Sequence, residues 1–188
     1  GDIQEAIDTC WYAGAEGRRL FGHTAPSELP RKMGMTLRRP IGVVGVITAW
    51  NFPVAVPSWK IFPALVCGNP VIWKPAEEAP ASGHLFAQCL VDAGLPKGVL
   101  NVVHGFGEEV GAAMVAHPAI PVLTFTGSTA VGREINAIGG RLLKRISLEL
   151  GGKNPVIVFA DADLDRKRSP ILAPVDGLEG HGLSGPKA

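Results

Sequence analysis

The sequence lacks any apolar stretch long enough to cross a lipid bilayer. Hydrophobic residues make up 46% of the 188 residues, but no uninterrupted apolar run approaches the ~18 residues that a membrane-spanning helix needs. The first residues, from Gly1 to Glu5, are polar and lack the basic and then apolar order of a secretory signal. We therefore expect a cytoplasmic protein that does not engage a membrane.

An excess of charge of one sign and a pattern of paired cysteines are absent too. The formal net charge is +1, which gives no electrostatic reason to expect binding to nucleic acid. The three cysteines, Cys10, Cys67 and Cys89, form no CxxC pair, and no histidine lies at zinc-ligand spacing. We therefore expect neither a disulfide framework nor a metal site.

Apolar runs of strand length recur along the chain. They begin at Ile41, Val71, Val99, Val122 and Ile146, close to the ~30-residue spacing of strand–helix–strand units. Runs that are apolar on both faces are typical of parallel strands covered by helices on each side. The pattern predicts an α/β fold with an open, doubly wound, Rossmann-like parallel sheet of about five strands and flanking helices, with ligands at the carboxyl ends of the strands.

The segments around these runs have helical periodicity, with apolar residues three and four positions apart. Two prolines in the first connector, Pro57 and Pro63, predict an irregular helix there. Residues 21–40 have no period and are predicted to form a loop. Helices are predicted over residues 2–20, 82–93, 108–117 and 129–138.

Lys74 and Glu77 follow the second strand. A carboxylate at that position can accept hydrogen bonds from ribose hydroxyls, and an ammonium can donate to them. The same carboxylate would repel a 2′-phosphate, which favours NAD over NADP. A surface charge pair in a loop is an equally good interpretation of these two residues taken alone.

Gly127 and Ser128 follow the fourth strand, and Gly132 comes one turn later. A glycine turn that leads into hydroxyl residues at a helix start offers backbone N–H groups and hydroxyls to a pyrophosphate. A capped helix after a tight turn is the alternative. Gly107 and Gly111 also have two interpretations, a plain turn or a small-residue floor under an adenine ring.

Two polar residues follow or close strands where chemistry is expected. Asn51, after the first strand, offers a side-chain amide where an oxyanion could develop, although it is also a common turn residue. Glu149, between two leucines at the end of the fifth strand, fits a partly desolvated general base. A buried, hydrogen-bonded structural carboxylate is the alternative for Glu149.

Four motifs occur in order at the strand ends, and together they are far more specific than any one alone. They are Trp50-Asn51-Phe52-Pro53, Lys74-Pro75-Ala76-Glu77, Phe125-Thr126-Gly127-Ser128-Thr129 with Gly132, and Leu148-Glu149-Leu150-Gly151-Gly152-Lys153-Asn154-Pro155. In this order the chain resembles the aldehyde dehydrogenase superfamily from about Asp2 to Asp165.

The resemblance implies roles for individual residues. In that family a cysteine thiolate attacks an aldehyde, hydride passes to NAD(P), and water hydrolyses the resulting thioester. Asn51 would stabilise the oxyanion, and Glu149 would activate the water. The residues that would bind the cofactor, NAD with NADP as the alternative, are Ile47, Thr48, Ala49, Trp50, Lys74, Glu77, Gly107, Gly111, Gly127, Ser128, Thr129, Val131 and Gly132.

The resemblance also implies an arrangement of domains. The expected parts are an N-terminal helix and loop (1–38), a dinucleotide-binding domain (39–153), the start of a catalytic domain (154–165) and a poorly ordered tail that does not resemble the family (166–188). The expected nucleophile, in a Gly-Gln-x-Cys setting after the glutamate, has no counterpart in the chain.

Three functions remain open from the sequence. The first is an aldehyde dehydrogenase fragment that keeps the cofactor-binding residues but does not turn over alone. The second is a non-catalytic dinucleotide-binding or interaction module, and a hydrolase-like remnant that uses Glu149 comes last. Apolar surface left uncovered in a fragment would favour self-association.

Overall fold

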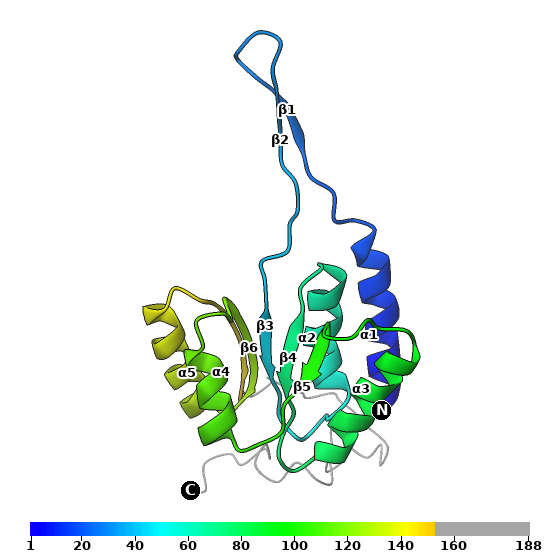
Figure 1. Cartoon of the computed structure of the whole chain (residues 1–188), viewed down its shortest axis with the longest axis vertical. Helices are drawn as coiled ribbons and strands as arrows, with labels where there is room; N and C mark the ends of the chain where they lie inside the picture. Colours follow the sequence, from blue (N-terminus) through cyan, green and yellow to red (C-terminus); the bar gives the residue numbers. More distant parts are fainter. Residues whose placement is uncertain (153–188) are drawn as a thin grey trace, which may run out of the picture. The chain divides into compact units, whose positions relative to one another are not determined.

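Parallel strands form the main sheet of the computed structural model, which describes residues 1–152 (Figure 1). Five strands lie in the order β5-β4-β3-β6-β7, and every neighbouring pair is parallel. Their bounds are β3 (Val44–Ile47), β4 (Val71–Lys74), β5 (Leu100–Val102), β6 (Val122–Gly127) and β7 (Arg145–Leu150). The predicted doubly wound α/β fold is confirmed.

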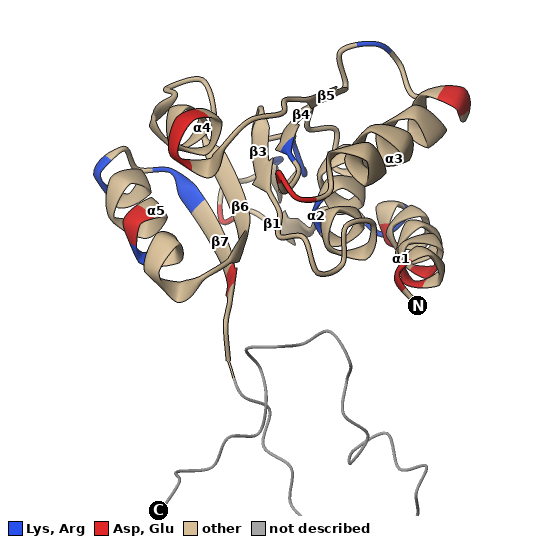
Figure 2. Cartoon of the chain, turned by 90° about the horizontal axis from the view of Figure 1, so that it is seen from below, with Lys and Arg blue, Asp and Glu red and all other residues tan. Residues whose placement is uncertain are grey.

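Helices cover both faces of this sheet (Figure 2). Three helices, α1, α2 and α3, lie on one side, and α4 and α5 lie on the other, with a short π-helical turn, η1, leading into α4. Their bounds are α1 (Asp2–Gly17), α2 (Ala55–Val66), α3 (Pro80–Asp92), η1 (Gly107–Gly111), α4 (Ala112–Ala116) and α5 (Thr129–Arg141). None of the helices in residues 1–152 is long and apolar enough to span a membrane.

Side-chain alternation along the strands divides the core into two clusters. On β3, Val46 packs toward α2 and α3 with Ile61 and Trp73, whereas Ile47 packs toward α4 and α5 with Leu123. Successive residues of a strand point to opposite faces of a sheet. Strands that are apolar on both faces therefore supply both clusters, as the sequence predicts.

The order of the strands creates a switch point between β3 and β6. After β3 the chain adds β4 and β5 on one side, then crosses back to add β6 and β7 on the other. Connections from β3 and β6 leave toward opposite faces of the sheet, which opens a crevice at their carboxyl ends. Ligands of open α/β sheets bind in such a crevice.

Two segments differ from the sequence prediction. The first connector forms one continuous helix, α2, although Pro57 and Pro63 lie within it. Pro57 occupies the first turn, where its missing N–H has no partner in the helix anyway. Residues 21–40 are not all loop, because β1 (Thr24–Pro26) and β2 (Met33–Met35) form an antiparallel hairpin. All six strand residues are exposed, so no burial period marks them in the sequence.

The first helix holds the start of α2. Asp2 accepts hydrogen bonds from the backbone N–H groups of Val54 (3.1 Å) and Ala55 (2.7 Å). Its carboxylate thus caps a helix on another part of the chain and satisfies N–H groups that a helix start leaves unpaired. Because Asn51 lies just before this cap, the contact fixes one end of the loop that carries it.

Candidate functional site

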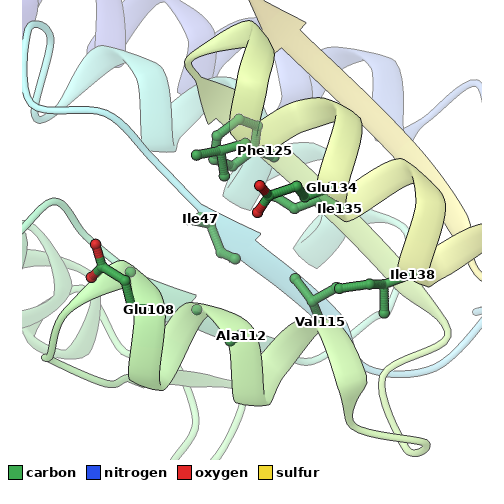
Figure 3. A pocket seen from close by; sticks show the side chains of 11 residues that line it. Ile47, Glu108, Ala112, Val115, Phe125, Glu134, Ile135 and Ile138 are labelled. Atoms are coloured by element: carbon green, nitrogen blue, oxygen red, sulfur yellow. The ribbon is translucent and has the colours of Figure 1, made fainter.

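A pocket of about 190 Å³ lies at the switch point. Figure 3 shows Glu108, Ala112 and Val115 on one wall, from η1 and α4, and Glu134 and Ile138 on the other, from α5. Its base is formed by the carboxyl-end residues of β3 and β6. The residues that line it are Ile47, Gly107, Glu108, Gly111, Ala112, Val115, Phe125, Val131, Glu134, Ile135 and Ile138.

The lining is apolar apart from two carboxylates. Ile47 ends β3 and pairs in register with Phe125 of β6. They are 8% and 6% exposed, so the base of the pocket belongs to the buried core. No lysine, arginine or histidine lines the pocket. A flat, uncharged group would therefore find mainly apolar contacts here, which is the usual character of a small-molecule site.

Lys74 and Glu77 form an ion pair beside this pocket. Lys74 Nζ lies 2.6 Å from Glu77 Oε2, and the Lys74 side chain is 2% exposed whereas that of Glu77 is 37% exposed. The hydrogen bond from Lys74 lowers the pKa of Glu77, and a hydrogen bond with the backbone of Gly107 adds to that effect. The carboxylate is therefore ionised, accessible and close to the start of η1.

Glycines at the pocket rim are not required by packing. A Cβ atom at Gly107 would meet nothing within 4 Å, and one at Gly111 would make only ordinary contacts of 3.9 Å with Ile47 and Lys74. At Gly132, in contrast, an added Cβ would collide with the Leu150 side chain. Gly132 thus lets α5 pack against β7, and its absent side chain has a structural explanation.

The start of α5 carries the hydroxyl predicted to meet a phosphate. Ser128 caps the helix, because its Oγ accepts a hydrogen bond of 3.3 Å from the N–H of Val131. Ser128 and Thr129 are both exposed. The Ser128 hydroxyl proton remains available to a ligand, as do the N–H groups that a first helical turn leaves without helix partners.

The segment after β3 turns from buried to exposed. Thr48 is 5% exposed, and its hydroxyl accepts a hydrogen bond of 3.0 Å from the indole N–H of Trp73. Ala49 is half-buried, and Trp50 and Asn51 are exposed. The amide of Asn51 is thus presented to solvent at the carboxyl edge of the sheet.

Glu149 does not have the desolvated setting that the sequence suggested, since its side chain is exposed. On β7 the neighbours Leu148 and Leu150 turn toward α5, so alternation turns Glu149 to the other face. Nothing in residues 1–152 covers it there. Among the described residues Glu149 is therefore not a buried, hydrogen-bonded carboxylate either.

Lys60 is a buried cation that sequence reasoning missed. It lies in α2 and is 8% exposed. Burial lowers the pKa of Lys60, and the negative charge of Glu149 opposes this shift. The sequence signal was a lone lysine within the apolar run of α2.

Thr126, on β6, is a second polar residue that sequence reasoning missed. Its hydroxyl is buried without a hydrogen-bond partner among the described residues, and Thr126 pairs in register with Glu149 of β7.

The cysteines lie away from the pocket. Cys10 is in α1, Cys89 is in α3, and Cys67 follows the carboxyl end of α2, near the amino edge of the sheet. All three are exposed. None of them lines the pocket.

The structure brings together part of the predicted cofactor set. Ile47, Gly107, Gly111 and Val131 line one pocket, and the Lys74–Glu77 pair adjoins it. The sequence missed the pocket walls on α4 and α5, because their apolar residues have the helical spacing of ordinary core positions. The missed lining residues are Glu108, Ala112, Val115, Phe125, Glu134, Ile135 and Ile138.

Comparison with known proteins identifies the family. A family model described as "Aldehyde dehydrogenase family" matches residues 1–178. The chain belongs to the aldehyde dehydrogenase family. The match extends to residue 178, so it includes part of the segment 166–188 that was expected not to resemble the family.

Relatives of this aldehyde dehydrogenase chain include retinaldehyde dehydrogenase 3 of Rattus norvegicus, 47% identical over 165 residues. That alignment covers 87% of this chain and 32% of the relative. Phenylacetaldehyde dehydrogenase of Pseudomonas fluorescens is 50% identical over 157 residues, which cover 81% of this chain and 31% of the relative. The chain therefore spans about a third of the length of the curated relatives that it matches.

Solved structures of aldehyde dehydrogenases have the same fold. The NAD+ complex of the enzyme from Bacillus cereus has a TM-score of 0.82 at 41% identity and covers 87% of this chain and 33% of its own. An NADP-dependent enzyme of E. coli has a TM-score of 0.83 at 41% identity, covering 88% and 34%. The structural neighbours thus include an NAD+ complex and an NADP-dependent enzyme.

Proposed function

We propose that this chain is the dinucleotide-binding part of an NAD-dependent aldehyde dehydrogenase. The observation that carries the proposal is the apolar pocket at the switch point, with an ionised, accessible carboxylate at its rim. The pocket takes the adenine end of the cofactor, and the bound NAD supplies a hydride acceptor for aldehyde oxidation. The aldehyde is the substrate of the whole enzyme.

Different residues of the chain bind different parts of the cofactor. Glu77 accepts hydrogen bonds from the adenosine ribose hydroxyls, and Lys74 holds that carboxylate in place from below. The open space at Gly107 and Gly111 admits the base and ribose. Ser128 and the free N–H groups at the start of α5 receive the pyrophosphate. The backbone from Ile47 to Trp50 and the turn at Gly127, with Thr129, Val131 and Gly132, complete the cradle.

NAD is preferred to NADP because of the charges at the rim. The Lys74 ammonium is already paired with Glu77 at 2.6 Å. Glu108 adds a second carboxylate to the lining. A 2′-phosphate would place two further negative charges beside these groups, with no free cation among the lining residues.

The nicotinamide end of the cofactor lies toward Asn51 and Glu149, the residues proposed to act in the reaction. Asn51 donates its side-chain amide hydrogen to the oxyanion that develops on the aldehyde carbonyl. Glu149 removes a proton from the water that attacks the acyl-enzyme. Its exposed side chain is accessible to that water, and Lys60 on α2 provides a positive charge within electrostatic range.

The 188-residue chain does not complete this reaction alone. The acyl-enzyme requires a thiolate nucleophile, and Cys10, Cys67 and Cys89 all lie outside the pocket lining. We propose that the chain binds NAD and produces no NADH by itself.

Calorimetric titration of the 188-residue chain with NAD and with NADP tests the binding. We expect NAD to bind and NADP to bind more weakly. An assay for NADH with a panel of aliphatic and aromatic aldehydes tests turnover, and we expect no signal. Absence of NAD binding would refute the main proposal, and aldehyde-dependent NADH would refute the claim that the chain is inactive alone.

A non-catalytic interaction module is the second candidate, and an exposed stripe on α1 favours it. Ile3, Ile7 and Trp11, one helical turn apart, are 67%, 46% and 78% exposed. We propose self-association through this stripe. Light scattering after size-exclusion chromatography should show dimers or larger species that Ile7→Glu disperses. A monomer at every concentration would contradict this candidate.

A further inference from the structure

We propose that Glu134 reads the exocyclic amine of adenine, so that the pocket selects a 6-aminopurine over a 6-oxopurine. This inference rests on the proposed dinucleotide function and adds to it the residue that determines which base is bound. It starts from the pocket lining, which is apolar except for Glu108 and Glu134. Each carboxylate only accepts hydrogen bonds when ionised.

The two carboxylates lie on opposite walls of the pocket. Glu108 is next in sequence to Gly107, whose backbone contacts the Glu77 carboxylate. The ribose binds beside this wall under the proposed function. Glu134 belongs to the opposite wall, on α5, between Val131 and Ile138 of the lining. Figure 3 shows its carboxylate directed toward the gap between α5 and the helix that carries Ala112 and Val115.

The two walls of the pocket offer apolar side chains to both faces of a flat ring. Ala112 and Val115 face Ile135 and Ile138 across the pocket, and Val115 and Ile135 are buried. A purine between these walls has its ring faces against carbon. Its edge then meets the single polar group of the α5 wall, the Glu134 carboxylate.

The chemistry of that edge separates two bases of the same shape. Adenine carries an amine at C6, which donates a hydrogen bond to a carboxylate. Hypoxanthine carries a carbonyl oxygen at C6, which would face a carboxylate held at the C6 position as a second acceptor, and its own donor on this edge is the neighbouring N1–H. Two acceptors that face each other lose a hydrogen bond and repel each other. The carboxylate therefore disfavours hypoxanthine as well as favouring adenine.

The test compares the binding of NAD and nicotinamide hypoxanthine dinucleotide to the 188-residue chain by calorimetry. We expect the wild-type chain to bind NAD roughly three- to tenfold more tightly, as one exposed hydrogen bond allows. Glu134→Gln should remove the preference, because a carboxamide can donate to the carbonyl of hypoxanthine as readily as it accepts from adenine. Circular dichroism verifies that the variant is folded.

Glu109→Gln is the matched control. Glu109 lies next to Glu108 in η1 but does not line the pocket, so this variant makes the same change of charge and should retain the preference. Equal binding of the two dinucleotides to the wild-type chain would overturn the inference and leave the proposed function standing. The inference would also be overturned if Glu108→Gln lost the preference for NAD while Glu134→Gln kept it. Failure of both dinucleotides to bind would overturn the proposed function itself.

Discussion

Glycines in this chain are explained by two different demands, and substitution should separate them. A Cβ at Gly111 makes only ordinary contacts, whereas one at Gly45 would lie 2.8 Å from Leu123 Cδ2 and 3.0 Å from Ile120 Cγ2 in the core. Gly111→Ala should leave the chain at least as stable, because alanine favours a helix by about 0.5–1 kcal/mol over glycine. It should weaken NAD binding by placing a methyl group in the pocket.

Gly45→Ala serves as the matched comparison for Gly111→Ala. It should destabilise the chain by about 1–3 kcal/mol through overpacking. Urea unfolding followed by NAD titration measures both properties. A Gly111→Ala variant with unchanged affinity would show that the cofactor does not approach this position.

Glu77 should set the choice between the two dinucleotides. Its carboxylate accepts from ribose hydroxyls in the proposed complex and repels a 2′-phosphate. Glu77→Gln should therefore weaken NAD binding by about tenfold, the worth of one charged hydrogen bond, and narrow the difference from NADP. Glu78→Gln, an exposed neighbour, is the control. An unchanged ratio of NAD to NADP affinity would contradict the role.

Lys60 should make stability depend on alkaline pH. Burial lowers the pKa of Lys60 in the folded chain, so the unfolded chain holds more protons as the pH rises through the folded and then the unfolded pKa. Stability increases with pH wherever the unfolded state binds more protons. At neutral pH the buried ammonium is therefore a burden, and Lys60→Met should be at least as stable as the wild type.

The advantage of Lys60→Met should shrink as the pH approaches the ordinary lysine pKa of about 10.4. Urea midpoints at several pH values measure this trend. Lys97→Met, at an exposed position, should show no such pH-dependent difference in stability from the wild type. A Lys60→Met variant that is less stable than the wild type at neutral pH would mean that the ammonium makes a net favourable interaction.

Sequence reasoning found the residues whose chemistry is local and missed those whose place depends on a distant element. The Lys74–Glu77 pair lies three residues apart on one turn, so its contact could be predicted directly. Glu134 joins the pocket only because α5 packs opposite α4, which no local pattern records. The exposure of Glu149 likewise depends on what covers the α2 face of β7, which its neighbours in the sequence do not record.

At the scale of elements, the Asp2 carboxylate should account for much of the attachment of α1. It accepts two backbone hydrogen bonds at the start of α2, at 2.7 and 3.1 Å. Asp2→Ala should destabilise the chain by about 1–2 kcal/mol, the usual loss for a helix cap. Asp8→Ala, on the exposed face of α1, is the control. Equal urea midpoints for the two variants would show that the cap is dispensable.

The strands and most helices could be predicted because burial leaves a period in the sequence. The run at 71–74 matches β4, since its residues are apolar on both faces. The β1–β2 hairpin left no such signal, because each of its strand residues is exposed. Pro57 was taken as an irregularity, although a proline in the first helical turn removes no helix hydrogen bond.

At the scale of the whole chain, NAD should protect one side of the sheet from hydrogen exchange. Bound cofactor stabilises the folded state by about 2.7 kcal/mol at a hundredfold excess over its Kd. Beyond that general effect, local protection should appear in η1 and in the first turns of α5, which form the pocket walls. Helix α1 and the β1–β2 hairpin should show none. Added protection confined to α1 or α3 would place the ligand on the wrong face.

The central position of β3 also determines at which stage of folding the pocket forms. Val44 on β3 pairs with Val71 of β4 and with Val122 of β6, so one neighbour comes early in the chain and the other much later. Pairing between distant segments requires closing a longer loop and slows folding. Because the two pocket walls follow β5 and β6, they meet only after the later pairing. Binding of the cofactor should thus be the last property that a refolding chain recovers.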